Sequence, residues 1–213
     1  MPRCGGRILQ ALINLRMQYQ ARTFALPELK GLSKKQIDVH LALYEGYVKN
    51  INLLMTTIAA YQKTEDEGGK LAIAEMRRRL GFEFDGMRMH EYYFEQFEGE
   101  RGGDPESALA KCAAERYGSG DEFIAHIKQV AGTRGIGWTV VYYDPAVKSI
   151  HTAWVDDHQL GQLAGLPIVL ALDMWEHAYM VDYVPADKKN YVDAFLDNVN
   201  WTVIEERFAR AAA

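Results

Sequence analysis

A carboxylate and an imidazole lie four positions apart in the C-terminal part of the chain, at Asp173 and His177. The preceding residues 163–172 (L-A-G-L-P-I-V-L-A-L) carry no charge, which is typical of a strand buried on both faces. If the chain becomes helical after this strand, the two side chains lie on one face about one turn apart. Such a pair can ligate one metal ion, with Trp175 and Tyr179 as apolar walls. An isolated pair of this kind is also common as a solvated pair or a helix cap.

The context of this pair carries more information than the pair itself. The string D-M-W-E-H-A-Y at 173–179 follows the apolar strand directly and closely resembles the C-terminal signature of the iron/manganese superoxide dismutases. The resemblance covers roughly residues 25–210 and implies two further histidine ligands. The predicted metal ligands are therefore His40, His90, Asp173 and His177. Three imidazoles and one carboxylate suit one iron or manganese ion per subunit, without separating the two metals.

His40 lies in a helical pattern that we predict from Ser33, its N-cap, to about Lys63. The residues expected to form its buried stripe are Val39, Leu43, Tyr47, Ile51 and Leu54. The resemblance implies that Tyr47 gates the substrate channel. Most members of the family have a histidine where Tyr44 falls, and one more residue between the ligand and the tyrosine. We interpret the shorter spacing from His40 to Tyr47 as the absence of a helical bulge, which keeps both residues on one face.

His90 and His158 are two further histidines to which the resemblance assigns a role. His90 opens H-E-Y-Y-F, which is similar to the H-x-x-x-W of the family, and alone it would be taken for an ordinary helix histidine. Gly86 matches the manganese-type pattern, in which a glycine leaves room for a side chain from the other lobe. His158 precedes Asp173 by fifteen residues, where a branch of the family has a histidine that hydrogen-bonds the metal-bound solvent. The resemblance thus implies Tyr47 and His158 as catalytic residues; the alternative for His158 is a polar loop histidine.

The order of elements, together with the resemblance, predicts an α+β fold. An N-terminal long helical hairpin domain is followed by a C-terminal α/β domain with a small antiparallel sheet. The charged, glycine-rich segment 98–106 is the best boundary between them. We assign residues 1–26 to a basic N-terminal extension, 27–98 to the hairpin domain and 107–213 to the C-terminal domain. Further expected elements are helices at 70–80, 87–97, 107–117 and 121–132, an interruption at 81–86, and strands at 138–143 and 149–155.

Composition restricts the class of protein further. The chain has 213 residues and a formal charge of -5, which fits one compact unit or two small lobes, and it has no basic stripe for nucleic acid. No uncharged run approaches the roughly 18 residues of a membrane helix. Cys4 and Cys112 make no disulfide framework, which predicts a reducing, cytoplasmic location. Residues 1–26 carry four arginines and no acidic residue, and we interpret them as a frayed or weakly amphipathic extension rather than a targeting peptide.

The resemblance implies a superoxide dismutase, which converts superoxide to dioxygen and hydrogen peroxide. It also implies a homodimer with Glu176 at the interface, in contact with the partner subunit's His177. We expect Lys188 to help attract the anion to a negatively charged protein. Two other functions stay open: a catalytically silent structural or interaction protein with this fold, and a metalloenzyme with other redox chemistry. The presence of all four predicted ligands favours the dismutase, because a protein without turnover would usually have lost one of them.

Overall fold

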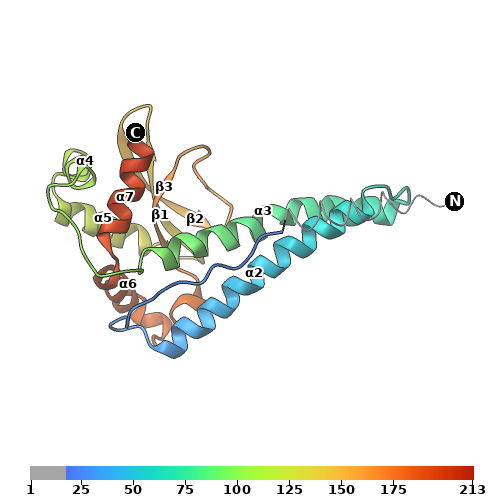
Figure 1. Ribbon diagram of the computed structural model, residues 1–213, viewed down its shortest axis with the longest axis horizontal. Helices are drawn as coiled ribbons and strands as arrows, with labels where there is room; N and C mark the ends of the chain where they lie inside the picture. The colour runs from blue at the N-terminus through green and yellow to red at the C-terminus, as the bar shows by residue number, and fades with distance from the viewer. Residues whose placement is uncertain (1–17) are drawn as a thin grey trace.

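The computed structural model describes residues 18–213, and Figure 1 shows a long helical hairpin that extends from a body of shorter helices and a small sheet. The α-helices are α2 (Lys34–Tyr61), α3 (Glu67–Glu95), α4 (Ala108–Tyr117), α5 (Gly120–Ala131), α6 (Lys188–Asn198) and α7 (Trp201–Ala212). The strands are β1 (Gly137–Asp144), β2 (Ser149–Asp156) and β3 (Ile168–Asp173), and two 3₁₀ turns follow β3, η1 (Glu176–Ala178) and η2 (Pro185–Asp187). The predicted α+β class, with a helical hairpin and a small antiparallel sheet, is confirmed. None of the described helices is long and apolar enough to cross a membrane.

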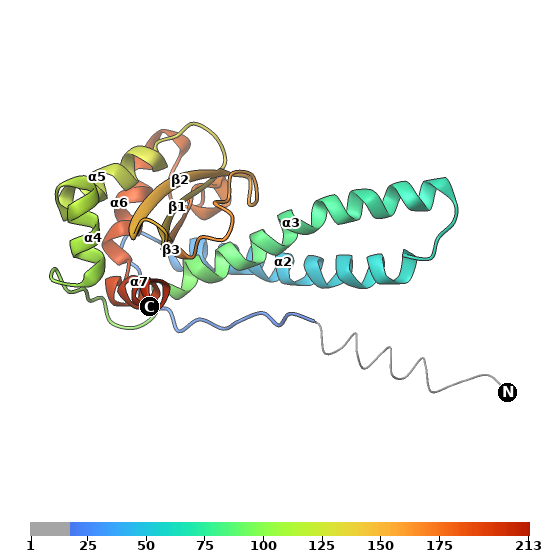
Figure 2. The ribbon, with the colours of Figure 1, turned by 90° about the horizontal axis from the view of Figure 1, so that it is seen from above.

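The helices α2 and α3 form the hairpin (Figure 2), and a polar side chain caps the start of each. The Ser33 hydroxyl accepts a hydrogen bond from Gln36 N at 3.1 Å, and an Asp66 carboxylate oxygen accepts one from Gly69 N at 2.7 Å. The helix α3 continues through 81–86, so the interruption predicted there is wrong. A glycine in a helix interior costs about 1 kcal/mol relative to alanine, and packing against neighbouring elements offsets this cost.

The buried face of α2 differs from the predicted stripe. Val39 and Leu43 are 40% and 37% exposed, so this part of the prediction is wrong. The buried positions of the helix are Gln36, Ile37, His40, Tyr44, Val48 and Ile51. The buried face of α2 is therefore shifted by about one residue from the predicted face, which is a rotation of about 100° around the helix axis. Apolar periodicity could not reveal this, because His40 and Tyr44 are polar residues that find their partners inside the protein.

The segment before α2 lies along the hairpin, between α2 and α3 in the view of Figure 1. Tyr19 N donates to Asn52 Oδ1 and Asn52 Nδ2 donates to Tyr19 O, both at 2.8 Å. Arg22 N donates to the Tyr44 hydroxyl, also at 2.8 Å. Of the predicted N-terminal extension, residues 1–17 lie outside the described part of the chain. The remainder is held against the hairpin by these hydrogen bonds, without helix or strand.

The sheet has the strand order β2-β1-β3 and is antiparallel, so β1 lies in the middle. In this register Trp138 of β1 lies opposite both Val155 of β2 and Asp173 of β3. Gly137 approaches β2 so closely that a Cβ there would lie 2.1 Å from Val155 O, and its φ of 156° also favours glycine. The strand β3 therefore ends with Asp173 beside Trp138.

One buried side chain connects the hairpin to the sheet. Gln96, directly after α3, donates through Nε2 to Ala171 O at 2.5 Å and accepts through Oε1 from Ala171 N at 3.3 Å. Ala171 lies on β3, which is an edge strand. The outward N–H and C=O groups of an edge strand have no strand partner. Gln96 thus completes the backbone hydrogen bonding of β3 in the interior of the protein.

We predict that Gln96→Met lowers the free energy of unfolding by about 2–4 kcal/mol, because it leaves the buried N–H and C=O of Ala171 unpaired. Gln129→Met, at an exposed position of α5, is the matched control and should change it by less than about 0.5 kcal/mol. Urea unfolding followed by circular dichroism measures both variants. Equal stability of the two would contradict the role assigned to Gln96.

Candidate metal centre

Four side chains from separate elements converge where the hairpin meets the sheet. His40 lies on α2, His90 on α3, Asp173 at the end of β3 and His177 in η1. One ligand atom from each lies within 4.8 Å of all the others. The first three side chains are fully buried, and that of His177 is 16% exposed. The structure thus brings together all four side chains that were predicted as metal ligands.

A single oxygen atom, Oδ2 of Asp173, is the centre of this cluster. Three imidazole nitrogens surround it: Nε2 of His40 at 3.0 Å, of His177 at 3.2 Å and of His90 at 3.5 Å. The other carboxylate oxygen, Oδ1, accepts a hydrogen bond from Trp175 N at 2.8 Å. This bond fixes the carboxylate so that Oδ2 faces the three nitrogens.

The His90 ring tests whether a cation fits the cluster. Its Nδ1 lies 2.6 Å from Gly86 O, so this nitrogen carries the proton and donates it to the carbonyl. Nε2 is left with a lone pair, and within residues 18–213 it is buried without a hydrogen-bond partner. A buried polar atom without a partner costs about 1–3 kcal/mol. A metal ion would coordinate this lone pair, so the donor set fits iron or manganese.

The charge states of His40, His90 and Asp173 at neutral pH are compatible with metal coordination. Burial lowers the pKa of His40, and it lowers the pKa of His90 well below its usual value. Burial alone would raise the pKa of Asp173. The charge of His177 and the hydrogen bonds from His177 and His40 outweigh that effect and hold the pKa below its usual range. His40 and His90 are therefore neutral while the carboxylate is ionised.

The chain after β3 brings His177 to Asp173 through a local structure that differs from the expected helix. Trp175 is extended, and the turn η1 that follows is a 3₁₀ helix of only 3 residues. Asp173 and His177 nevertheless face each other at 3.2 Å. The helix α2 holds the turn in place, because Gln36 Nε2 donates to His177 O at 2.6 Å and Gln36 Oε1 accepts from Val181 N at 2.9 Å.

The sequence of the chain is similar to the sequences of known proteins. A family profile described as iron/manganese superoxide dismutases, C-terminal domain, matches residues 105–207. The chain is 32% identical over 206 residues to superoxide dismutase (Fe) of Saccharolobus solfataricus, which covers 91% of this chain and 97% of the relative. The chain belongs to the iron/manganese superoxide dismutase family.

Other relatives in the iron/manganese superoxide dismutase family carry names for either metal. Superoxide dismutase (Mn) 2 of Halobacterium salinarum is 32% identical over 169 residues, or 79% of this chain and 82% of the relative. Superoxide dismutase (Fe) of Aquifex aeolicus is 32% identical over 187 residues, or 86% of this chain and 87% of the relative. The predicted resemblance is confirmed, and the degree of similarity does not separate iron from manganese.

In this member of the iron/manganese superoxide dismutase family, Tyr47 and His158 form a hydrogen-bonded pair beside the cluster. Trp138 Nε1 donates to His158 Nδ1 at 2.9 Å. His158 therefore carries its proton on Nε2, which donates to the Tyr47 hydroxyl at 2.7 Å. The centres of the Tyr47 and His158 rings lie 5.1 Å and 5.9 Å from that of His90. The Tyr47 hydroxyl keeps its own hydrogen for a further hydrogen bond.

Burial holds this pair in one protonation state at neutral pH. It lowers the pKa of His158 to about 4, and it raises the pKa of Tyr47 above its usual value. Two aromatic rings exclude solvent from His158: the Phe82 ring meets it edge-on at 4.6 Å and the Trp175 ring stacks on it at 4.8 Å. At neutral pH His158 is therefore neutral and Tyr47 keeps its proton.

The packing of Tyr47 corrects the expectation for Gly86. A Cβ at Gly86 would lie 2.6 Å from Tyr47 Cδ1, so the glycine leaves room for this ring. We expected the room to be taken by a side chain of the other lobe, whereas Tyr47 belongs to the same hairpin. The helix α2 is continuous from His40 to Tyr47, in agreement with the interpretation that this chain lacks a helical bulge.

Sequence reasoning gave no role to Trp138, although its indole decides the tautomer of His158. The available signal was the string G-I-G-W at 135–138, in which Gly137 permits close approach of β1 and β2. Lys188, which was expected to attract the anion, donates to Thr133 O at 3.3 Å. In the described part of the chain it makes no hydrogen bond with the four clustered residues.

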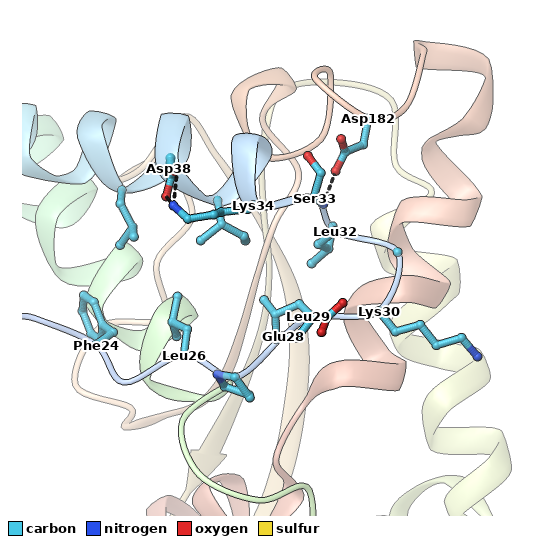
Figure 3. Close-up of a pocket in the computed structure, with 14 residues that line it drawn as sticks. Phe24, Leu26, Glu28, Leu29, Lys30, Leu32, Ser33, Lys34, Asp38 and Asp182 are labelled. Atoms are coloured by element: carbon cyan, nitrogen blue, oxygen red, sulfur yellow. Dashed lines mark hydrogen bonds and ion pairs between the residues drawn. The ribbon is translucent and has the colours of Figure 1, made fainter.

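The cluster lies apart from the open groove shown in Figure 3. This groove has a volume of about 910 Å³ and runs between residues 24–33 and the first turns of α2. Apolar side chains such as Leu29 and Ile37 line it together with Lys34 and Asp38, which form an ion pair at 2.6 Å. None of the four clustered residues lines the groove. The donor set is therefore separate from this groove.

We predict that Gly86→Ala displaces the Tyr47 ring and weakens its hydrogen bond with His158, because the new Cβ would overlap the ring. The free energy of unfolding should fall by about 1–3 kcal/mol. Gly81→Ala on the same helix is the matched control, since a Cβ there meets only Gln159, at 4.0 Å. Its higher helix propensity should stabilise the protein by up to about 1 kcal/mol. Urea unfolding compares the two, and equal stabilities would show that Gly86 is not needed for space.

Proposed function

We propose that the protein is a superoxide dismutase, which converts two superoxide anions and two protons into dioxygen and hydrogen peroxide with one iron or manganese ion per subunit. One observation carries the proposal: three imidazole nitrogens meet a buried carboxylate oxygen, and His90 Nε2 has no protein partner within the described residues. Membership of the family supports it, because relatives named for both metals match most of the chain.

The proposed metal ligands are Nε2 of His40, His90 and His177 and Oδ2 of Asp173. A bound iron or manganese ion would supply a one-electron redox couple, the chemistry that dismutation of two superoxide anions requires. The chain holds three nitrogen donors and one negative charge in fixed positions for that ion. Gly86 O orients the His90 ring, and Trp175 N orients the Asp173 carboxylate.

Tyr47 and His158 are the proposed catalytic residues, because peroxide formation requires protons close to the reduced oxygen. His158 Nε2 donates to the Tyr47 oxygen, which directs the remaining O–H of Tyr47 away from His158. Burial raises the phenol pKa, so this proton stays on Tyr47 at neutral pH. Tyr47 can therefore donate a hydrogen bond to a small anion that binds beside His90. Trp138 keeps His158 in the tautomer that this arrangement needs.

Metal analysis combined with a superoxide assay tests the proposal. The protein is loaded separately with iron and with manganese, and metal content and superoxide consumption are measured for each form. We expect one metal ion per chain and catalytic consumption of superoxide. Loss of a residue that only orients a ligand weakens metal binding about 10- to 100-fold. His90→Asn removes a proposed ligand itself and should weaken metal binding by more than this. His126→Asn is the matched control, since that ring stacks on Tyr117 and is not in the cluster.

Other outcomes would favour the two alternatives. Metal binding without superoxide consumption would favour a metalloenzyme with other redox chemistry. Neither metal binding nor activity would favour a catalytically silent structural or interaction protein with this fold. The more active metal-loaded form would also decide between iron and manganese, since three imidazoles and one carboxylate accept either ion.

We also propose a homodimer in which Glu176 links the two metal centres. Glu176 is exposed beside His177, whose Nε2 faces Asp173. Nδ1 of the partly exposed His177 ring is then free to donate to Glu176 of the partner subunit. Gln36 joins α2 to the segment after η1, and exposed apolar side chains lie on both. These side chains, typical of an interface, are Val39, Leu43, Met180 and Val181.

Glu176→Ala should shift the protein toward the monomer and lower its metal affinity, because the His177 ring would lose the carboxylate that orients it. Loss of such an outer-shell partner costs about 10- to 100-fold in metal affinity. Glu115→Ala, at an exposed position of α4, removes the same charge elsewhere and should change neither property. Sedimentation and metal analysis measure both. Unchanged mass and metal content in Glu176→Ala would refute this contact.

We further propose that the enzyme is cytoplasmic and acts as an antioxidant. Cys112 is a free thiol in the described structure, and Cys4 lies outside the described residues. A chain with two cysteines and no disulfide framework suits a reducing compartment. Removal of superoxide in that compartment is the antioxidant role that the proposed reaction supplies.

A further inference from the structure

Arg79 of α3 lies against the aromatic wall that surrounds Tyr47 and His158. Its guanidinium carbon is 3.7 Å from the centre of the Phe82 ring. The centre of the same ring is 4.6 Å from that of His158 and 6.1 Å from that of Tyr47. Charges interact over about 10 Å in 0.1 M salt. These separations put the charge of Arg79 within that range of Tyr47 and His158. A single ring thus touches both the cation and the proposed catalytic pair.

Arg79 forms an ion pair with Glu83 in which the arginine is the more exposed partner. Its Nε and Nη2 both lie 2.9 Å from one oxygen, Oε1, of Glu83. The Arg79 side chain is 53% exposed, whereas that of Glu83 is 6% exposed. The second oxygen of Glu83, Oε2, is buried and has no hydrogen-bond partner in the described part of the chain. Arg79 therefore keeps Nη1 and an exposed face for a further anion, while the Glu83 side chain is held inside.

Both charges act on the proposed catalytic pair. Burial lowers the pKa of His158 to about 4, and the charge of Arg79 acts in the same direction. Burial raises the pKa of Tyr47, the charges of Asp173 and Glu83 raise it further, and the charge of Arg79 opposes them. An anion next to Tyr47 would experience the same two charges of Arg79 and Glu83.

We infer that Arg79 attracts small anions such as superoxide toward the aromatic wall at Phe82, next to Tyr47 and His158, and that the buried Glu83 reduces this attraction. The inference rests on the proposed dismutase function. In a chain with a formal charge of -5, a cation close to the site offsets the overall repulsion of an anion. Lys188 is the cation that was expected to have this role. Its Nζ donates to Thr133 O and lies 5.5 Å from the centre of the Trp154 ring.

Charge variants of the metal-loaded protein test the inference. Arg79→Gln should lower kcat/KM for superoxide about two- to tenfold at low ionic strength. This is the range expected when an anion loses one unit charge about 8 Å away in a partly aqueous setting. The loss should shrink as salt is added. Glu83→Gln should raise kcat/KM, and Arg79→Lys should restore most of the loss, because it keeps the charge. A merely structural role of Arg79 would give neither the salt dependence nor the opposite sign for Glu83.

Azide binding gives a readout that does not depend on turnover. The dissociation constant of azide, measured from the absorption of the metal-loaded protein, should rise in Arg79→Gln and fall in Glu83→Gln. Arg77→Gln is the matched control, because it changes the net charge equally at an exposed position about 200° away around α3. It should leave the azide dissociation constant and kcat/KM unchanged.

The outcomes separate this inference from the proposed function. If the wild-type protein binds metal but consumes no superoxide, weaker azide binding in Arg79→Gln would still support the inference for small anions. If the wild-type protein is active and Arg79→Gln behaves like Arg77→Gln, the inference alone is overturned. A loss in Arg79→Gln that is independent of salt and not restored by lysine also overturns it, since packing on Phe82 would then be the cause. Absence of metal binding overturns both.

Discussion

The buried carboxylate of Asp173 determines how the helical hairpin and the sheet meet. A carboxylate without exposed surface costs several kcal/mol unless partners are arranged around it. Its partners are three imidazoles and the backbone N–H of Trp175, and they come from α2, α3 and the segment after β3. No single element can satisfy it. The hairpin and the sheet must therefore dock, and the same docking assembles the donor set that suits a metal ion.

Buried polar groups set the position of the hairpin relative to the sheet. Gln96 pairs with both backbone groups of Ala171. The Tyr191 hydroxyl of α6 donates to Asp173 O at 2.7 Å and lies 3.3 Å from the Tyr93 hydroxyl of α3. Hydrogen bonds depend on direction and distance, whereas apolar packing tolerates small shifts. Hydrogen bonds are therefore suited to hold two proposed metal ligands in place. Nε2 of His40 and Oδ2 of Asp173 lie 3.0 Å apart although their residues are 133 positions apart in the sequence.

Tyr44 shows how this chain differs from the family pattern without losing the site. Its hydroxyl accepts a hydrogen bond from Arg22 N at 2.8 Å and donates one to Glu91 Oε1 at 3.2 Å. Burial raises the pKa of the phenol to about 12, so it remains a donor at neutral pH. The Phe24 ring packs edge-on against Tyr44 at 5.7 Å. The residue that stands where most members have a histidine thus fixes the segment before α2 against the hairpin.

The sequence alone determined the order of most elements, the family resemblance and the four side chains that converge, because short local patterns carry this information. It did not determine that α3 is uninterrupted or which face of α2 is buried. Glycine content and apolar periodicity are local signals, and tertiary packing overrode both: a glycine of α3 makes room for Tyr47, and the polar His40 and Tyr44 turn inward. The hydrogen bonds that link Trp138, His158 and Tyr47 became visible only in the folded chain. Tyr47 and His158 are 111 positions apart, and such a pairing leaves no trace in the local sequence.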